Sequence, residues 1–289
     1  MIDNAAGRQN ISDIAAKIKQ AVIDAAEYLT KALGSGKPLE LNYKSDSTLV
    51  MNLDLESQRI ILQHLQDSYP IVAEEDPASH ARISEGGSYF LVDPLDGTTS
   101  CKRFLGQRGG HVGYGPLVGF VHQGELVVAA FFSIPHRRLF MAVSGQGTTM
   151  TDFGDDFRSV QTAKKLVAPE CLDLKQAGML FFISQFGEAS VVEYLRKQNA
   201  IENIYRFGGF ASDCARLAQG YEQIQIQFAV KPWDFAAVLL AAEAGCEVFC
   251  DPLKRRVPLK QWRIEHNNPV VTVASKGRTA LFELLDRMK

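Results

Sequence analysis

The sequence lacks an excess of charge of either sign. Its 289 residues include 31 Lys and Arg against 33 Asp and Glu, which gives a formal net charge of -2. The basic residues form no stripe, and their densest patches, at 136–138 and 254–256, are short and lie beside turn prolines. A nucleic acid is therefore not expected as the main partner.

The sequence also lacks membrane and disulfide signals. No stretch reaches the roughly 18 uncharged apolar residues that a membrane helix needs, and the first residues contain no apolar signal core. The five cysteines are odd in number and form no C-x-x-C pair, which favours a reducing compartment. We expect a soluble cytoplasmic protein with no membrane partner, and its 46% hydrophobic residues are enough for a large core.

Several common catalytic patterns are missing. The chain contains no G-x-S-x-G, no H-E-x-x-H and no G-x-x-x-x-G-K-[ST], and its six histidines never fall at paired metal-ligand spacing. The Gly36-Lys37 pair is not a P-loop, because Lys31 stands where the first glycine should be and Pro38 replaces Ser or Thr. Serine hydrolase, zinc protease and P-loop chemistry find no support.

What the chain does have is a pair of acids in YFLVDPLDGTTS, residues 89–100. The apolar residues 89–92 favour a buried strand, which we expect Pro94 and Gly97 to end, so that Asp93 and Asp96 follow it directly. Two carboxylates on such a turn suit a hard cation such as Mg²⁺, and the Gly97-Thr98 backbone suits an anion. An ordinary Asx-rich turn is the alternative.

More acids follow other elements of the predicted structure. Glu74 and Glu75 come after the short apolar stretch 71–73, where they are either solvated or neutralised by a cation. Asp234 heads the apolar helix predicted over 235–244, where the helix dipole alone would favour it. Asp54 begins the helix predicted over 54–69, where it reads as an N-cap.

Taken together, these motifs resemble a known family. Glu74-Glu75, then D-P-L-D-G-T at 93–98, then W-D-F-A-A at 233–237, in this order, are similar to the inositol monophosphatase family of Mg²⁺-dependent, lithium-sensitive phosphatases. The likeness extends over most of the chain and is weakest at 101–114 and 154–208. It implies an α/β fold with a layered αβαβα sandwich, as in the inositol monophosphatase and fructose bisphosphatase-like proteins.

The order of elements predicts two subdomains. A helix over 11–33, capped by Asn10 or Ser12, and the helix over 54–69 precede three hairpin-linked strands at 117–122, 126–134 and 139–143, which indicate an antiparallel sheet. After Gly154 strands and helices alternate, including helices over 187–198, 212–219 and 277–288. We therefore expect an α+β subdomain over 1–154 with most metal ligands, and an α/β subdomain over 155–289 that contributes Asp234.

The resemblance also implies roles for individual residues. Two or three Mg²⁺ ions, which Mn²⁺ can replace, would be bound by Glu74, Glu75, Asp93, the Leu95 carbonyl, Asp96 and Asp234. Thr98, paired with Asp54, would orient and deprotonate the attacking water beside Glu74. Phosphate and substrate would contact Gly97, Thr98, Lys44, Gly208, Gly209 and Gln227, although an exposed loop lysine is an equal interpretation of Lys44.

Departures from the family pattern leave the substrate open. Gln227 stands where a glutamate often contacts the alcohol, Phe210 is bulkier than usual, and a glycine-rich insertion at 106–115 brings Arg108 and His111 near the site as a lid, a clamp or an idle loop. We expect a small phosphate monoester resembling inositol 1-phosphate. The alternatives are 3′(2′),5′-bisphosphate nucleotidase, histidinol-phosphatase or fructose-1,6-bisphosphatase activity, or a non-catalytic binding protein. A homodimer is expected by analogy.

Overall fold

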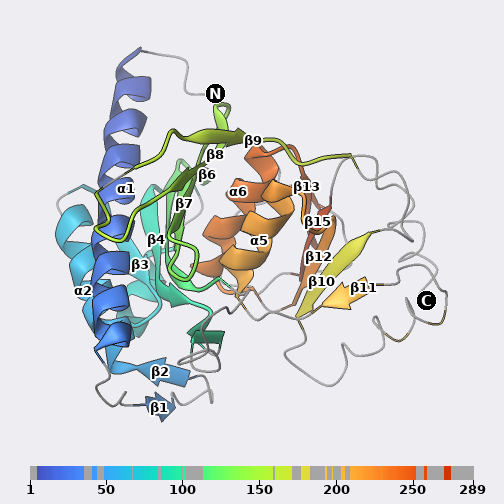
Figure 1. The fold of residues 1–289 in the computed structure, drawn as a ribbon. Coiled ribbons are helices and arrows are strands. Elements are labelled where there is room, and N and C mark those ends of the chain that lie inside the picture. The colour runs from blue at the N-terminus through green and yellow to red at the C-terminus, as the bar shows by residue number, and fades with distance from the viewer. Residues whose placement is uncertain are drawn as a thin grey trace.

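The computed structural model describes most of the chain. The described residues are 5–35, 41–43, 49–66, 68–83, 86–98, 100–101, 113–158, 160–170, 177–182, 193, 197, 203–205, 209–228, 230–251, 257–258 and 270–274. They form successive layers of helix, sheet, helix and sheet (Figure 1). None of the described helices is long and apolar enough to cross a membrane.

The outer helical layer consists of α1 (Ala5–Gly34) and α2 (Asn52–Leu65). One face of α1 carries Ile14, Ile18, Ala25 and Leu29, which follow helical spacing and are buried. The helix begins before Ile11, so the prediction that Asn10 or Ser12 caps it is wrong, and both residues lie within it. Beside this layer β1 (Leu41–Tyr43) and β2 (Leu49–Met51) pair as a small antiparallel ribbon.

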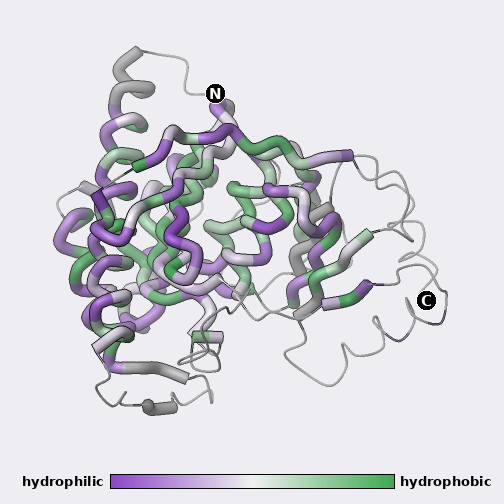
Figure 2. Tube along the Cα trace, viewed as in Figure 1, coloured by the Kyte–Doolittle hydropathy of each residue, from purple (hydrophilic) through white to green (hydrophobic). Residues whose placement is uncertain are grey.

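The first large sheet has seven strands in the order of the sequence. They are β3 (Ile71–Ala73), β4 (Tyr89–Asp96), β5 (Gly115–His122), β6 (Glu125–Ser133), β7 (Arg138–Val143), β8 (Gly147–Asp152) and β9 (Lys164–Leu166). All pairs are antiparallel except β3 with β4, so the predicted antiparallel run from β5 to β7 is confirmed. Helices cover both faces, and the central strands are correspondingly apolar throughout (Figure 2).

The second half of the chain supplies the inner helices and another sheet. The inner layer contains α5 (Phe210–Gln219), the 3₁₀ turn η4 (Asp234–Ala237) and α6 (Val238–Glu243). The six-stranded sheet has the order β11 (Asn203–Tyr205), β10 (Gly178–Phe182), β12 (Ile224–Gln227), β15 (Val270–Ala274), β13 (Glu247–Asp251) and β14 (Val257–Pro258). The fold is thus mixed α/β, as predicted. Of the helix predicted over 187–198 only residues 193 and 197 are described, and the one over 277–288 lies outside the described residues.

Close contacts fix the inner helices against the first sheet. A Cβ on Gly119 of β5 would lie only 2.6 Å from the Ala236 Cβ, so the glycine lets η4 approach the strand. The Thr148 hydroxyl of β8 donates to the Leu240 carbonyl at 2.6 Å. At the end of α6, the Glu243 carboxylate accepts the backbone N–H groups of Gly145 and Gly147, both at 3.0 Å. These contacts position η4, which begins with Asp234.

Candidate metal centre

A β-bulge in β4 brings Asp93 and Asp96 to one side of the sheet. Residues three apart in a regular strand point to opposite faces. Asp93 pairs with Leu117 and Asp96 with Gly115, so β4 carries one extra residue between them. The neighbouring leucines show that the strand changes face. In a regular strand Leu91 and Leu95 would share a face, but Leu91 packs in the core beneath α5 and α6, whereas Leu95 packs in the core beneath α1 and α2. Asp96 therefore returns to the face of Asp93.

The bulge is held by side chains around it. Pro94 has no N–H to leave unpaired, and its carbonyl accepts the buried Ser57 hydroxyl of α2 at 2.7 Å. The Asp93 carboxylate accepts the Leu95 N–H at 2.9 Å, which fixes the aspartate side chain. The prediction that Pro94 ends the strand is wrong, because the bulge and Ser57 accommodate it and β4 continues to Asp96.

Asp96 is bound by the N-terminus of α5. The N–H groups of Phe210 and Ala211 donate to its two carboxylate oxygens at 3.0 and 3.1 Å. A helix N-terminus favours negative charge. Gly209 makes the approach possible, since a Cβ at this position would lie 2.9 Å from the Asp96 Oδ2 atom. The second half of the chain thus orients a carboxylate of the first half.

Asp234 enters the same space from η4. Asp234 is the first residue of η4, in the first-turn position that the sequence predicted, and its carboxylate accepts the N–H of Lys231, three residues earlier, at 3.3 Å. The preceding Trp233 packs on His80 with ring centroids 4.6 Å apart. His80 in turn contacts the Ala73 carbonyl at 3.0 Å, at the end of β3. This stack ties the segment of Asp234 to the segment that leads into Glu74.

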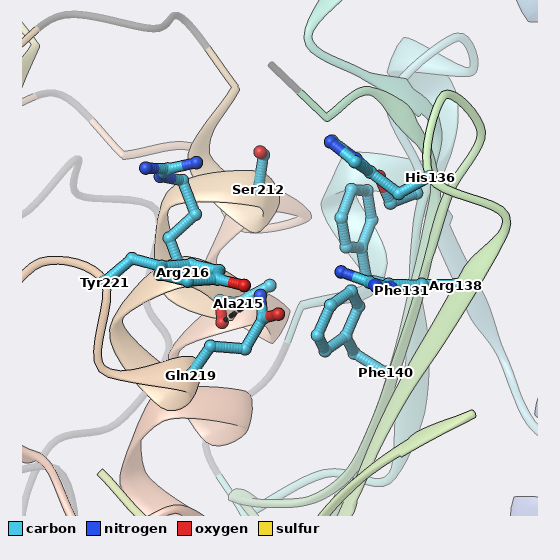
Figure 3. Close-up of a pocket in the computed structure, with 10 residues that line it drawn as sticks. Phe131, His136, Arg138, Phe140, Ser212, Ala215, Arg216, Gln219 and Tyr221 are labelled. Atoms are coloured by element: carbon cyan, nitrogen blue, oxygen red, sulfur yellow. Dashed lines mark hydrogen bonds between the residues drawn. The ribbon is translucent and has the colours of Figure 1, made fainter. Parts of the chain in front are cut away.

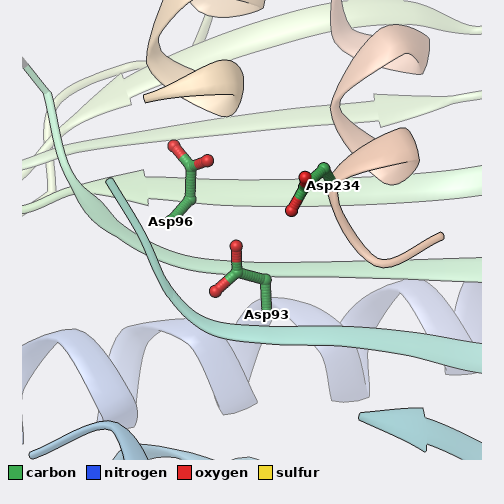
Figure 4. A group of neighbouring side chains, drawn as sticks. All are labelled: Asp93, Asp96 and Asp234. Carbon is green, nitrogen blue, oxygen red and sulfur yellow. The ribbon is translucent and has the colours of Figure 1, made fainter. Parts of the chain in front are cut away.

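The three aspartates form a compact cluster (Figure 4). Each offers one carboxylate oxygen, and these oxygens all lie within 4.8 Å of one another. Burial raises the pKa of Asp93 well above its usual range, and the charges of Glu74, Asp96 and Asp234 raise it further. Burial likewise raises the pKa of Asp234, and it raises that of Asp96 to about 7 against the lowering effect of the α5 amides. By surface exposure Asp93 and Asp96 are buried and Asp234 is half-buried. Such converging carboxylate oxygens are the donor set of a hard divalent cation.

Glu74 lies close enough to this cluster to interact with all three aspartates, and Glu75 follows it in the chain. The Glu74 N–H donates to the Val92 carbonyl at 3.0 Å, continuing the β3–β4 pairing, and its charge raises the pKa of all three aspartates. Glu75 is half-buried, and its N–H donates to the Gln58 side chain at 3.0 Å. The metal-binding roles of both glutamates and of the Leu95 carbonyl stay predictions.

The two residues predicted to activate water lie in different settings. Thr98 follows the turn at Gly97, and its hydroxyl donates to the Leu95 carbonyl at 3.0 Å. Asp54 is buried in the first turn of α2 with 1% of its surface exposed. Burial raises the pKa of the Cys101 thiol to about 12, and the charge of Asp54 contributes to this rise. The expectation that Asp54 is an N-cap is wrong, because the helix already begins at Asn52. Their pairing stays a prediction.

The predicted substrate residues are only partly described. Gly97 has φ +81°, a backbone conformation that favours glycine, and its Cα lies beside Gly209. Gln227 ends β12 with 7% of its surface exposed. Lys44, Gly208, Arg108 and His111 lie outside the described residues. Substrate contacts therefore stay predictions for all of these positions.

Sequence reasoning missed the groups that orient the acids. Neither Ser57 nor the amides of Phe210 and Ala211 stand out, because a buried serine and a helix N-terminus acquire a role only when distant elements pack together. Gly209 carried a signal, since a glycine pair before an apolar helix often marks a close approach of backbone.

Comparison with known proteins places this fold and this acidic cluster in a class. The sequence profile described as the inositol monophosphatase family matches residues 10–283, and the chain belongs to that family. Among curated relatives, the Nus factor SuhB of Vibrio cholerae is 25% identical over 233 residues, which cover 79% of this chain and 82% of the relative.

Solved structures share the fold. The extragenic suppressor protein suhB from Bartonella henselae superposes with a TM-score of 0.73 at 19% identity, over 96% of this chain and 98% of its own. An IMPase/NADP phosphatase has been solved with Mg²⁺ and phosphate (TM-score 0.69) and with D-inositol-1-phosphate (0.68). Both of these structures are 21% identical, and they cover 96% of this chain and 95% and 96% of their own.

Proposed function

We propose that the protein is a Mg²⁺-dependent phosphatase that hydrolyses a small phosphate monoester. The observation that carries the proposal is the convergence of Asp93, Asp96 and Asp234, from both halves of the chain, to within 4.8 Å. Buried carboxylates so close together repel one another unless a cation neutralises them. Membership of the inositol monophosphatase family supports the same chemistry.

The cluster residues and Glu74 would hold the ions, with Glu75 and the Leu95 carbonyl contributing. Bound Mg²⁺ would supply charge neutralisation at the phosphate and a lowered pKa for the attacking water. The turn at Gly97 would present its amide and that of Thr98 to phosphate oxygens. The Thr98 hydroxyl would donate to the Asp54 carboxylate in place of Leu95 and accept a hydrogen bond from the water, so that Oγ1 takes a proton from the water as its own proton passes to Asp54.

A substrate resembling inositol 1-phosphate is favoured among the monoesters. A relative of the same fold is known in complex with D-inositol-1-phosphate. Gln227 is buried, and its neutral amide would contact the substrate where the family often has a carboxylate. This would lower the affinity for a polyol. Nucleotide bisphosphate, histidinol phosphate and fructose bisphosphate therefore remain the alternatives within this chemistry.

The substitution Gln227→Glu tests the polyol assignment. A charge-assisted hydrogen bond is worth about 1 to 2 kcal/mol more than a neutral one, so the KM for inositol phosphate should fall by up to about tenfold. Gln66→Glu, which adds the same charge at an exposed position directly after α2, is the control and should leave the KM unchanged. If Gln227→Glu instead loses activity on the best substrate, the polyol assignment is wrong.

A second candidate function is a binding or regulatory role on the same fold. The observation in its favour is the similarity to relatives named Nus factor SuhB. In this case the acidic cluster would be retained for metal binding alone. A homodimer, expected from the family, fits either function.

One assay separates the candidates. The purified chain is incubated with a panel of phosphorylated metabolites, with Mg²⁺ or with EDTA, and released phosphate is measured. The proposal expects Mg²⁺-dependent release from at least one monoester, with Asp93→Asn as the inactive control. Phosphate release from none of them in the presence of Mg²⁺ would favour the binding protein.

A further inference from the structure

A polar cavity lies between α5 and the β6–β7 hairpin, apart from the metal centre (Figure 3). It has a volume of about 40 Å³. At roughly 10 to 15 Å³ for each water position, this is the space of about three waters or one tetrahedral oxyanion. The aspartates of the metal centre do not line it.

The charge of the lining favours an anion. Ten residues line the cavity, and they include three basic side chains, two serines, a glutamine and a tyrosine but no Asp or Glu; the carboxylates that pair with Arg138 and Arg216, Asp152 and Glu222, lie outside the lining. The chain as a whole has more acidic than basic residues, so an acid-free lining is not what its average surface would give. Phe131, Phe140 and Ala215 provide apolar walls, in which a hydrogen bond to a charged ligand is strengthened.

Arg138 supplies the most direct anion ligand. Its Nε donates to the Asp152 carboxylate at 2.5 Å, which fixes the plane of the guanidinium. Within the described part of the chain, no hydrogen bond engages its two terminal NH₂ groups. Figure 3 shows this guanidinium pointing across the cavity toward Gln219 and the Tyr221 hydroxyl. Terminal guanidinium groups in this geometry bind phosphate oxygens.

Other donors converge on the same space. The Ser212 hydroxyl accepts the Gly113 N–H at 3.0 Å, so its own proton is available to a ligand. His136 contacts the Ser133 hydroxyl through Nδ1 at 2.8 Å, and both side chains line the cavity. Arg216 adds mainly its aliphatic stem, because its head group is engaged by Glu222 at 2.5 and 2.8 Å.

We infer that this cavity is a binding site for a phosphate group, separate from the metal centre. It connects to that centre through the first turn of α5: Ser212 lines the cavity, and the amides of Phe210 and Ala211 hold Asp96. The ligand is either free inorganic phosphate or the phosphate of a phosphorylated metabolite, since both present the same oxyanion.

Metal-free protein isolates the new site in a binding experiment. In EDTA the carboxylates of the metal centre repel phosphate, so inorganic phosphate titrated against the full chain and followed by ³¹P NMR line width reports the cavity alone. We expect saturable binding in the millimolar range. Arg138→Gln, and Gln219→Glu, which places a carboxylate opposite Arg138, should each weaken it at least tenfold.

Arg137→Gln is the matched control, because the neighbouring arginine pairs with Asp155 and does not line the cavity. Glycerol phosphate in a parallel titration identifies the ligand: equal affinity indicates a metabolite, and weaker binding indicates inorganic phosphate. The inference is overturned if phosphate binding does not saturate, or if Arg137→Gln weakens it as much as Arg138→Gln. Circular dichroism confirms that each variant is folded. Because no turnover is measured, failure here leaves the phosphatase proposal untouched.

Discussion

At the scale of single residues, the dominant feature is the unfavourable electrostatic free energy of the three aspartates when no cation is bound. Each has a raised pKa because burial and neighbouring carboxylates disfavour its charged form. Such a cluster lowers the stability of the metal-free protein. It also makes the electrostatic energy of binding a cation strongly favourable.

Asp93→Asn should separate function from stability. Removing one ligand is expected to abolish Mg²⁺-dependent phosphate release. The metal-free melting temperature at pH 8 should rise by about 2 to 4 °C, the equivalent of roughly 1 kcal/mol, because repulsion is relieved. Phosphate release and calorimetric melting in EDTA measure the two effects. Asp13→Asn, on the exposed face of α1, is the control that should change neither; near-normal activity in Asp93→Asn would refute the metal centre.

Thr98→Ala tests the proposed proton relay. Loss of the hydroxyl should lower the rate by roughly 10²-fold, as loss of a positioned general base does, while Mg²⁺ affinity changes little. Thr98→Ser keeps the hydroxyl and should recover most of the rate. The alternative role is structural, because the Thr98 hydroxyl donates to the Leu95 carbonyl. If Mg²⁺ affinity falls in step with activity, the threonine serves the turn and not the water.

Residue by residue, the sequence predicted the acids better than their surroundings. Asp93 and Asp96 were recognisable because they directly follow an apolar segment, whereas Asp234, at the head of an apolar helix, was assigned to the site through the family resemblance. Asp54 was misread as a cap, since a helix boundary two residues away depends on packing that local pattern does not contain. Ser57 was not recognisable, because its bond to the Pro94 carbonyl spans 37 positions of sequence.

At the scale of elements, the junction between α6 and the β7–β8 turn determines how η4 is placed. Glu243→Gln should weaken the two hydrogen bonds to Gly145 and Gly147 and destabilise the protein by about 1 to 3 kcal/mol. Urea unfolding measures this as a lower midpoint with an unchanged slope. Glu125→Gln, at the exposed start of β6, should leave the midpoint unchanged. Equal midpoints for the two variants would show that the junction contributes nothing.

The elements themselves were largely predictable where their pattern is local. The hairpins from β5 to β7 follow from apolar runs separated by turn residues, and their pairing agrees with that expectation. The β4 bulge did not follow, because Pro94 normally ends a strand and only contacts with α2 allow it to continue.

At the scale of the whole molecule, the site exists only when both halves pack together. Asp93 and Asp96 come from the first sheet, and Asp234 comes from the inner helical layer. The order of motifs along the chain predicted this assembly through the family resemblance. The residues alone could not, since no local pattern sets the distance between segments more than 100 positions apart.

Stability should depend on pH in the direction set by these carboxylates. A pKa raised on folding contributes stability at low pH, and this contribution is lost as pH rises through the folded value, which for Asp96 is about 7. In EDTA, the melting temperature of the wild type should therefore fall relative to Asp234→Asn between about pH 5 and 8. Saturating Mg²⁺ should reverse the order. If the melting temperatures of the two proteins change with pH in parallel, the carboxylates do not set the pH dependence of stability.

The single extra residue in β4 makes the site sensitive to chain length rather than to side-chain identity. Substituting Pro94 or Leu95 changes packing but keeps the count between the two aspartates. Inserting one residue between them, with the bulge kept, would shift the register by one, so that Asp96 pointed toward α1 and α2 and an apolar core faced a buried charge. Natural variants of this segment should therefore differ in residue type and almost never carry one extra residue between the two aspartates.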